Sequence, residues 1–247
     1  MAQPKLRLDA LLVARGMCAD LHAAQAQVMA GAVVVGARRA DKPGELVRAD
    51  AVVRIKGADH GYVSRGGLKL AAALDALQVP VLGKQCIDVG AATGGFTDCL
   101  LQRGAAAVVA VDVGYGLLHD KLRRDPRVHV RERTHARALA QAQLPFAVEL
   151  LVADLSFIGL QSLLPELVAA VAPGGQLLLM VKPQFEVAKH EVPAGGVVAD
   201  PLLRQQVVAR VVATAQAMGL TPLGTADAGV AGPAGNQEVF VWLQKPL

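Results

Sequence analysis

Two lysines and two carboxylates, spread over most of the 247-residue chain, have the side chains needed to deprotonate a weakly acidic hydroxyl. They are Lys69 in SRGGLKL, Asp154 in ADLSFI, Lys182 in MVKPQFE and Glu238 in AGNQEVF. Each lies at or near the end of an apolar run, where a sheet would hold its side chain at an open edge. We therefore expect the four to converge and to act on a hydroxyl. The alternative is a set of unrelated, solvated ion pairs at strand ends.

A glycine-bearing turn in IDVGAATGGFTD separates an apolar strand from a helix start. Its spacing, D-x-G-x-x-x-G-G, differs from the dinucleotide pattern and also occurs in purely structural turns. The next strand ends at Asp112, about 20 residues further on, where a carboxylate can accept both hydroxyls of a ribose. Loop and acid together favour an adenosine cofactor, although Asp112 could also be a simple strand-end cap. No GxxxxGK[ST] motif is present, which disfavours a P-loop NTPase.

The elements that must position these residues follow two patterns along the chain. Residues 1–59 read as helix, helix, strand, turn, strand, with Gly16 ending the first helix, Asp20 capping the second, and strands within 32–40 and 46–57. A linker is expected at 60–63. In residues 64–247 near-continuous apolar strands alternate with helices, for example the helix that begins at Pro201. This alternation predicts a parallel, doubly wound sheet covered on both faces.

The composition sets limits on partners and cellular location. The chain is 53% hydrophobic and only 3% aromatic, and its net charge of +4 suits an anionic partner contacted through Arg, Lys and backbone. No apolar run is long enough to span a membrane, so a cytoplasmic protein without a membrane span is expected. Cys18, Cys86 and Cys99 show no metal-ligand spacing, so we expect free thiols and no metal. No pattern indicates an oligomeric state.

The whole chain resembles the TlyA family, in which a small S4-like RNA-binding domain precedes an FtsJ-like methyltransferase domain. The matching stretches include RLDALLVARG, YVSRGGLKL, VDVGYG, ADLSFI, VKPQFE and GNQEVF. The resemblance implies an α/β, Rossmann-like doubly wound methyltransferase domain after an α+β S4-like domain. It also implies S-adenosylmethionine-dependent 2′-O-methylation of cytidine in 16S and/or 23S ribosomal RNA, within small and/or large ribosomal subunits. Susceptibility to capreomycin-type antibiotics is linked to such proteins.

The resemblance also implies roles for individual residues. It makes Lys69, Asp154, Lys182 and Glu238 a catalytic tetrad. It places the methyl donor against the glycine loop and the acid beyond it, at Asp88, Gly90, Ala91, Gly94, Gly95, Phe96 and Asp112. One position departs from the family: after ERT the family commonly has Asn, and this chain has His135. His135 could replace the amide as a hydrogen-bond donor near the adenine, or face solvent.

Arginines provide candidate contacts to RNA. In the N-terminal segment these are Arg7, Arg15, Arg38, Arg39 and Arg48, and Arg65 lies beside the linker. A second basic stretch, DKLRRDPRVHVRERTHAR, could track phosphates or simply form an exposed loop and strand edge. Two other functions compete with an RNA methyltransferase: a membrane-active haemolysin, a label that relatives have carried, and a non-catalytic RNA-binding protein. The chain shows no spanning or strongly amphipathic segment, which argues against a membrane-active haemolysin. The intact tetrad argues against a non-catalytic RNA-binding protein.

Overall fold

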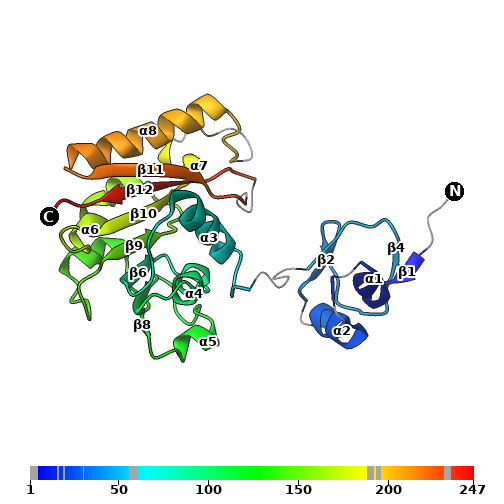
Figure 1. Ribbon diagram of the computed structural model, residues 1–247. Helices are drawn as coiled ribbons and strands as arrows, with labels where there is room; N and C mark the ends of the chain where they lie inside the picture. Colours follow the sequence, from blue (N-terminus) through cyan, green and yellow to red (C-terminus); the bar gives the residue numbers. More distant parts are fainter. Residues whose placement is uncertain are drawn as a thin grey trace. The chain divides into compact units, whose positions relative to one another are not determined.

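The computed structural model describes residues 5–15, 17–18, 20–29, 31–55, 61–187, 192, 196–230 and 235–247. Their contacts divide the chain into two compact units, Met1–Gly61 and Tyr62–Leu247 (Figure 1). The predicted domain boundaries, 1–59 and 64–247, stay a prediction, and residue 60 of the predicted linker lies outside the described residues. Residues 62 and 63 of that linker belong to the second unit, where Val63 N donates to Asp98 Oδ2 at 2.9 Å.

The first unit is a small α+β body with its own core. It contains β1 (Lys5–Arg7), α1 (Leu8–Ala14), α2 (Leu21–Met29), β2 (Val33–Val35), β3 (Arg38–Arg39), β4 (Leu46–Arg48) and β5 (Val53–Ile55). The strands form two antiparallel sheets, β1-β4 and β3-β2-β5. Leu8, Leu12, Val28 and Val33 are fully buried between them and the helices. Burial of these apolar side chains is what holds so small a unit together.

Three expectations for this unit can be compared with its structure. The cap at Asp20 is confirmed, because Asp20 Oδ1 accepts from Ala23 N at 2.7 Å. The expected strand in 32–40 is instead the hairpin β2–β3, since Gly36 turns the chain with φ 63°. The expected strand in 46–57 is divided into β4 and β5, which join different sheets. Gly16, the expected helix stop, lies outside the described residues.

The second unit is built on a 7-stranded sheet of order β11-β12-β10-β9-β6-β7-β8. Its strands are β6 (Gln85–Val89), β7 (Ala107–Val111), β8 (Val128–Arg131), β9 (Leu150–Ala153), β10 (Gln176–Val181), β11 (Thr221–Asp227) and β12 (Val239–Gln244). The five strands from β10 to β8 in this order pair in parallel, and β12 is antiparallel to both β10 and β11. The predicted doubly wound α/β fold is therefore confirmed.

Helices cover both faces of this sheet (Figure 1). They are α3 (Gly66–Leu77), α4 (Gly95–Gln102), α5 (Asp120–Arg123), η1 (Ala136–Gln141), η2 (Leu160–Ser162), α6 (Leu164–Ala169), α7 (Pro183–Glu186) and α8 (Pro201–Ala217). The expected helix start at Pro201 is confirmed, with Asp200 Oδ1 accepting from Leu202 N at 2.9 Å. Alternate residues of β10 enter opposite cores: Leu177 and Leu179 face α6 and α8, and Leu178 faces α3 and α4.

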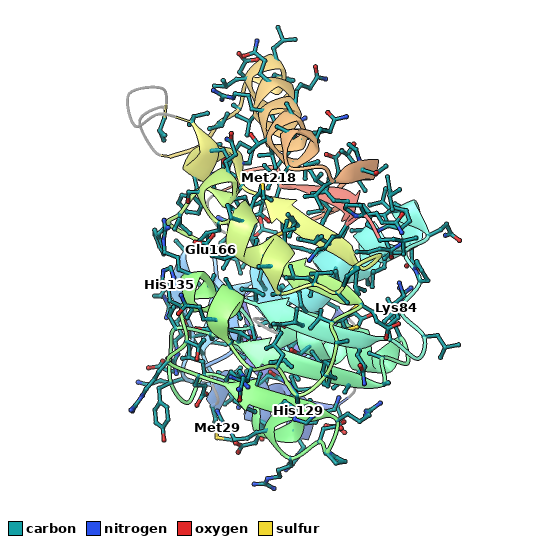
Figure 2. All side chains as sticks on the ribbon, turned by 90° about the vertical axis from the view of Figure 1, so that its left-hand side faces the viewer. Met29, Lys84, His129, His135, Glu166 and Met218 are labelled. Atoms are coloured by element: carbon teal, nitrogen blue, oxygen red, sulfur yellow. The ribbon has the colours of Figure 1, made fainter. Side chains whose placement is uncertain are left out.

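The strand order reverses between β6 and β9, because the chain leaves β6 toward β7 and returns to β9 on its other side. In doubly wound sheets this reversal opens a crevice at the carboxyl ends of the strands, where ligands bind. Figure 2 shows His135 on the opposite side of the view from Lys84, which directly precedes β6. The residues that line this crevice should therefore lie at the end of the sheet away from Lys84.

Candidate active site

The first ion pair lies at the carboxyl ends of the adjacent strands β9 and β10. Lys182 follows β10, and its Nζ lies 2.6 Å from Asp154 Oδ1. The same nitrogen donates a hydrogen bond to Ser156 Oγ at 2.7 Å. Pro183 begins α7 directly after Lys182, whose backbone is extended with φ −107° and ψ 102°. Strand end and proline together hold the amine at the carboxyl edge of the sheet.

The second ion pair joins α3 to the start of β12. Lys69 Nζ donates to Glu238 Oε2, and the two residues are only 7% and 3% exposed. Because removal of either partner would leave a buried unpaired charge, each fixes the position of the other. Val181 pairs with Val239, so Lys182 and Glu238 extend this strand pairing by one step. The fold therefore brings the two ion pairs to the same edge of the sheet.

Gly90 directly follows β6 and makes a close approach to the end of β9. Its φ is 87°, and a Cβ at this position would lie 2.4 Å from the carbonyl oxygen of Asp154. Only glycine tolerates both the backbone conformation and the contact. Gly90 therefore sets the spacing between the glycine loop and a member of the first ion pair.

The other small residues of the loop serve packing in this structure. A Cβ on Gly94, the N-cap of α4, would meet the side chain of Leu122 at 2.2 Å. A Cβ on Gly95 would meet the backbone nitrogen of Gly67 at 2.9 Å, so this glycine lets α4 begin against α3. Ala91 and Phe96 are 7% and 3% exposed, and the ring centroid of Phe96 lies 5.9 Å from that of Phe240.

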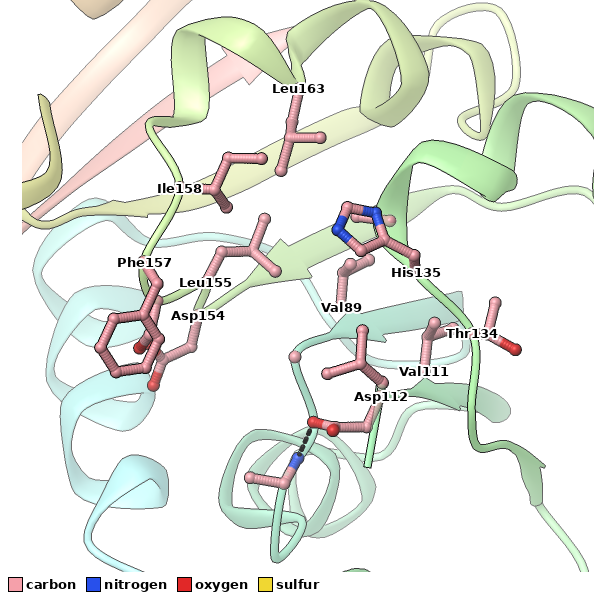
Figure 3. Close-up of a pocket in the computed structure, with 15 residues that line it drawn as sticks. Val89, Val111, Asp112, Thr134, His135, Asp154, Leu155, Phe157, Ile158 and Leu163 are labelled. Carbon is pink, nitrogen blue, oxygen red and sulfur yellow. Dashed lines mark hydrogen bonds between the residues drawn. The ribbon is translucent and has the colours of Figure 1, made fainter. Parts of the chain in front are cut away.

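Asp112 follows β7 and organises the glycine loop from the neighbouring strand. Its Oδ2 accepts from Ala92 N at 2.8 Å and its Oδ1 accepts from Gly114 N at 2.7 Å. Each carboxylate oxygen has a second lone pair, so both can still accept from a ligand hydroxyl. Figure 3 shows the carboxylate beside the loop, where it borders a cavity.

This cavity of about 450 Å³ lies beyond β6, β7 and β9, at the point where the strand order reverses. It is lined by Val89, Gly90, Ala92, Val111, Asp112, Val113, Thr134, His135, Ala136, Asp154, Leu155, Ser156, Phe157, Ile158 and Leu163. Its size is that of a site for a small molecule. Apolar walls with a carboxylate at one end fit an adenine ring and its ribose. Asp154 contributes both to this cavity and to the first ion pair (Figure 3).

Asp88 lies beneath the glycine loop and is fully buried. Its Oδ2 accepts from the backbone nitrogen and the hydroxyl of Thr97, at 2.9 and 2.7 Å. Its Oδ1 has no hydrogen-bond partner among the described residues. Burial raises the pKa of Asp88 to about 7, and the charges of Asp154 and Asp112 act in the same direction. Asp88 does not line the cavity, so here it supports the start of α4.

His135 lines the cavity and caps η1. Its Nδ1 accepts from Arg137 N at 3.1 Å, an interaction that an Asn side-chain oxygen can also make at a helix N-cap. In a neutral imidazole with Nδ1 used as an acceptor, the proton is on Nε2. Figure 3 shows the ring turned toward the cavity. His135 can therefore keep the cap and still offer a donor to a ligand.

The sequence reasoning missed Ser156 and Phe157. Ser156 contacts the Lys182 amine, and Phe157 is 92% exposed with φ 67°. The available signal was their position in ADLSFI, directly after a strand-end acid. The left-handed backbone of Phe157 cannot be read from sequence, because non-glycine residues rarely adopt it.

Most arginines of the first unit already have partners within that unit. Arg7 binds Asp9, which is fully buried, and Arg38 binds Glu45. Arg48 binds Asp50 at 2.7 Å, and Arg15 donates to the carbonyl oxygens of residues 49 and 51. Arg39 is exposed and forms no ion pair with another described residue. The same side chains that could contact RNA thus also hold the unit together.

The arginines of the second unit also interact locally. Arg123 binds Glu132, and the guanidinium of Arg133 lies 4.2 Å from the ring centroid of Tyr115. Arg65 is exposed and occupies the N-cap position of α3, one helical turn before Lys69. The predicted RNA contacts therefore lie on the surfaces of the two units, each described by itself.

Neither metal ligands nor reactive thiols were found among the described residues. No group of three or more His, Cys, Asp or Glu side chains in the described ranges could hold a metal ion. Cys18, Cys86 and Cys99 are free, and burial raises the pKa of Cys86 and Cys99 to about 12. No described helix is long and apolar enough to cross a membrane.

Comparison with known proteins shows two family matches along the chain. Residues 62–245 match the model of the FtsJ-like methyltransferase, and residues 6–53 match the S4 domain. The chain is 45% identical, over 97% of its length and 90% of the relative's, to the 16S/23S rRNA (cytidine-2′-O)-methyltransferase TlyA of Mycobacterium tuberculosis.

Two solved structures support the same fold. A Streptococcus thermophilus protein that carries a hemolysin name is 38% identical, with 99% of this chain and 90% of that chain covered and a TM-score of 0.76. Aeropyrum pernix fibrillarin, solved with natively bound S-adenosyl-L-methionine, is 17% identical. The match covers 86% of this chain and 94% of that one, with a TM-score of 0.54. Because the identity to fibrillarin is only 17%, this similarity shows the fold alone.

Proposed function

This chain belongs to the FtsJ-like methyltransferases, within the TlyA family, and we propose that it transfers methyl from S-adenosylmethionine to the 2′-OH of cytidine in ribosomal RNA. One observation carries the proposal: Asp154 lines the adenosine-sized cavity and also holds the amine of Lys182 at 2.6 Å. A methyl donor in the cavity and a hydroxyl beside the amine would thus meet at a single residue.

The residues of the cavity fit the proposed cofactor. Asp112 has acceptor capacity for the ribose hydroxyls, and His135 can donate toward the base. S-adenosylmethionine, when bound, supplies a methyl group that its sulfonium already makes electrophilic. The chain's own task is therefore to orient and deprotonate the nucleophile, because a ribose hydroxyl is scarcely ionised at neutral pH.

In the proposed mechanism Lys182 acts on the 2′-OH. As a neutral amine it takes the hydroxyl proton, and as an ammonium it stabilises the oxyanion that develops. Asp154 orients the amine, and the buried pair of Lys69 and Glu238 fixes the charge distribution behind it. The oxygen–carbon bond forms as the sulfur–carbon bond breaks, and sulfur keeps the electron pair.

We further propose that the S4 unit delivers RNA within small or large ribosomal subunits through Arg7, Arg15, Arg38 and Arg39, and that Arg65 of the second unit adds a contact. Phosphate contacts of this kind supply most of non-specific RNA affinity and weaken as salt rises. Action on ribosomal subunits would place the protein in the cytoplasm and could link it to capreomycin-type susceptibility. The domain division 1–59, 60–63 and 64–247 is part of this proposal.

The experiment that tests the proposal is transfer of labelled methyl from S-adenosylmethionine to isolated small and large subunits, followed by mapping of the modified nucleotide. We expect label on the ribose of a cytidine in one or both RNAs, and labelling slower by about 10²-fold or more with Lys182→Ala. Absence of transfer to both subunits, or label on a base, would contradict it. Release of haemoglobin from erythrocytes without cofactor would instead support the haemolysin alternative.

A further inference from the structure

The amine of Lys182 is held by two side chains and not by Asp154 alone: it forms an ion pair with Asp154 and a hydrogen bond with Ser156. Asp154 Oδ1 lies 2.6 Å from Nζ, and Ser156 Oγ accepts a hydrogen bond from Nζ at 2.7 Å. A lysine nitrogen has four tetrahedral directions, of which its own carbon chain takes one. The hydrogen bond to Ser156 takes one of the other three. The contact with Asp154 is an ion pair without hydrogen-bond geometry, since Asp154 Oδ1 has no hydrogen-bond partner among the described residues.

Both side chains come from the same end of β9, and contacts with α7 fix the loop that carries them. Glu186 of α7 accepts from Leu160 N and, at 3.2 Å, from Gln161 Nε2. The ring centroids of Phe157 and Phe185 lie 5.4 Å apart, and Phe185 stands between Lys182 and Glu186 in the sequence. The loop 154–160 is thus attached to residues 182–186 at both ends. Ser156 and Lys182 are therefore held at a fixed separation.

Ser156 is not a core residue. Its side chain is exposed and lines the adenosine-sized cavity, next to the place where the proposed reaction would occur. Because the hydroxyl is not needed to fill space, its contact with the Lys182 amine is the main interaction that a change to alanine would remove. A charge-assisted hydrogen bond of this length is among the stronger polar contacts in proteins.

We propose that Ser156 is a positioning residue for methyl transfer. Asp154 holds the Lys182 amine in place by charge, and the hydrogen bond to Ser156 fixes its orientation, so that a direction not used by Ser156 meets the 2′-OH of the target nucleotide. The inference rests on the function proposed above. In the step itself the hydroxyl oxygen bonds to the methyl carbon, the sulfur–carbon pair stays on sulfur, and the proton leaves to the amine or to solvent. Ser156 changes none of these bonds and acts through Lys182.

The test is single-turnover methylation of isolated subunits by the full chain at saturating cofactor. Ser156→Ala should slow transfer about 10- to 100-fold, the range for losing a hydrogen bond to a charged group. Ser156→Thr, which keeps the hydroxyl, should restore most of that loss. The matched control is Ser162→Ala, because Ser162 lies in the adjoining η2 and donates only to Gly159 O, at 2.9 Å. That control should stay within about threefold of the unmodified protein.

Two further readouts separate positioning from a general structural effect. Calorimetric affinity for S-adenosylmethionine should change less than about threefold in Ser156→Ala, because the hydroxyl acts on Lys182 and not on the cofactor. In a Lys182→Ala background the serine change should have almost no further effect, since residues that act through each other are not additive.

A Ser156→Ala rate within threefold of the unmodified protein would overturn the inference. An equal loss from Ser156→Ala in the Lys182→Ala background would overturn it too. Both outcomes leave the proposed function intact if the unmodified protein methylates a subunit. Absence of methylation by the unmodified protein would refute the proposed function itself, and the role of Ser156 with it.

Discussion

At the scale of single residues, the chemistry depends on how two lysines are held. Lys69 is buried against Glu238, whereas Lys182 contacts Asp154 and Ser156 at the wall of the cavity. The Lys69–Glu238 pair is less accessible, since the two residues are only 7% and 3% exposed. The two lysines therefore cannot have the same role, and Lys182 is the one that we expect to meet the hydroxyl.

Lys182→Ala should lower the rate of methyl transfer by about 10²-fold or more, the scale for losing one transition-state stabiliser or a general base. Lys182→Arg should be a poor replacement, because guanidinium stays protonated and has a different donor geometry. Single-turnover rates at saturating cofactor provide the measurement, and affinity for cofactor and subunit should change far less. A Lys182→Ala rate within a few-fold of the unmodified protein would remove Lys182 from the mechanism.

The buried carboxyl of Asp88 should make the stability of the fold depend on pH. Burial raises its pKa from 3.8 to about 7, so the folded protein binds a proton more tightly than the unfolded chain. The stability of the fold should therefore fall as pH rises from about 4 to about 7, by up to about 4 kcal/mol from this group. Asp88→Asn keeps the acceptor for Thr97 and removes the titration.

Denaturant unfolding of both proteins at pH 5 and pH 8 checks this expectation. Asp88→Asn should gain clearly more stability over the unmodified protein at pH 8 than at pH 5, because only part of the loss has accumulated at pH 5. An identical difference at the two pH values would show that Asp88 does not titrate between them.

At the scale of elements, the site depends on close contact between the ends of β6 and β9. Gly90→Ala should destabilise the protein and weaken cofactor binding, because a Cβ would lie 2.4 Å from the Asp154 carbonyl oxygen. Gly83→Ala is a matched control, since Gly83 has a similar φ of 74° and nothing within 4 Å of an added Cβ. It should show only the conformational penalty, about 1 kcal/mol.

Thermal unfolding and calorimetry with S-adenosylmethionine measure the two effects. We expect cofactor affinity to fall at least about tenfold in Gly90→Ala and to stay within about twofold in Gly83→Ala. Equal behaviour of the two variants would mean that the approach of the glycine loop to β9 does not shape the site.

At the scale of the whole molecule, each unit has a hydrophobic core made of its own residues. A chain starting at Tyr62 should therefore fold and keep the cofactor cavity. It should bind ribosomal subunits at least about tenfold more weakly, with a shallower dependence on salt, because the arginines of the first unit are gone. Subunit binding by filtration over a salt series tests this.

The truncated protein also tests the proposed division of labour. Circular dichroism and a cooperative melting transition establish whether residues 62–247 fold without the first unit. Subunit affinity and methylation equal to those of the full chain would contradict RNA delivery by residues 1–61.

Much of this arrangement is readable in the sequence, for identifiable reasons. Apolar runs that alternate with helix signals predict a doubly wound sheet, because strands buried on both faces lack polar residues. Lys182 and Asp154 could be placed at the carboxyl edge because each ends such a run. The glycine-rich turn predicted a role for Gly90, and the spacing of about 20 residues after this turn predicted a role for Asp112.

Other features were decided only by the tertiary structure. Which amine pairs with which carboxylate depends on strand order and register. Lys69 and Glu238, for example, are 169 positions apart and meet only because β12 lies beside β10. The pairing of Arg38 with Glu45 depends on the path of the chain between β3 and β4, which sequence patterns place poorly. The contact of Ser156 with Lys182 depends on a loop in which Phe157 has φ 67°, a conformation that its residue type disfavours. Residue types thus predict what chemistry is possible, whereas long-range packing determines which groups perform it.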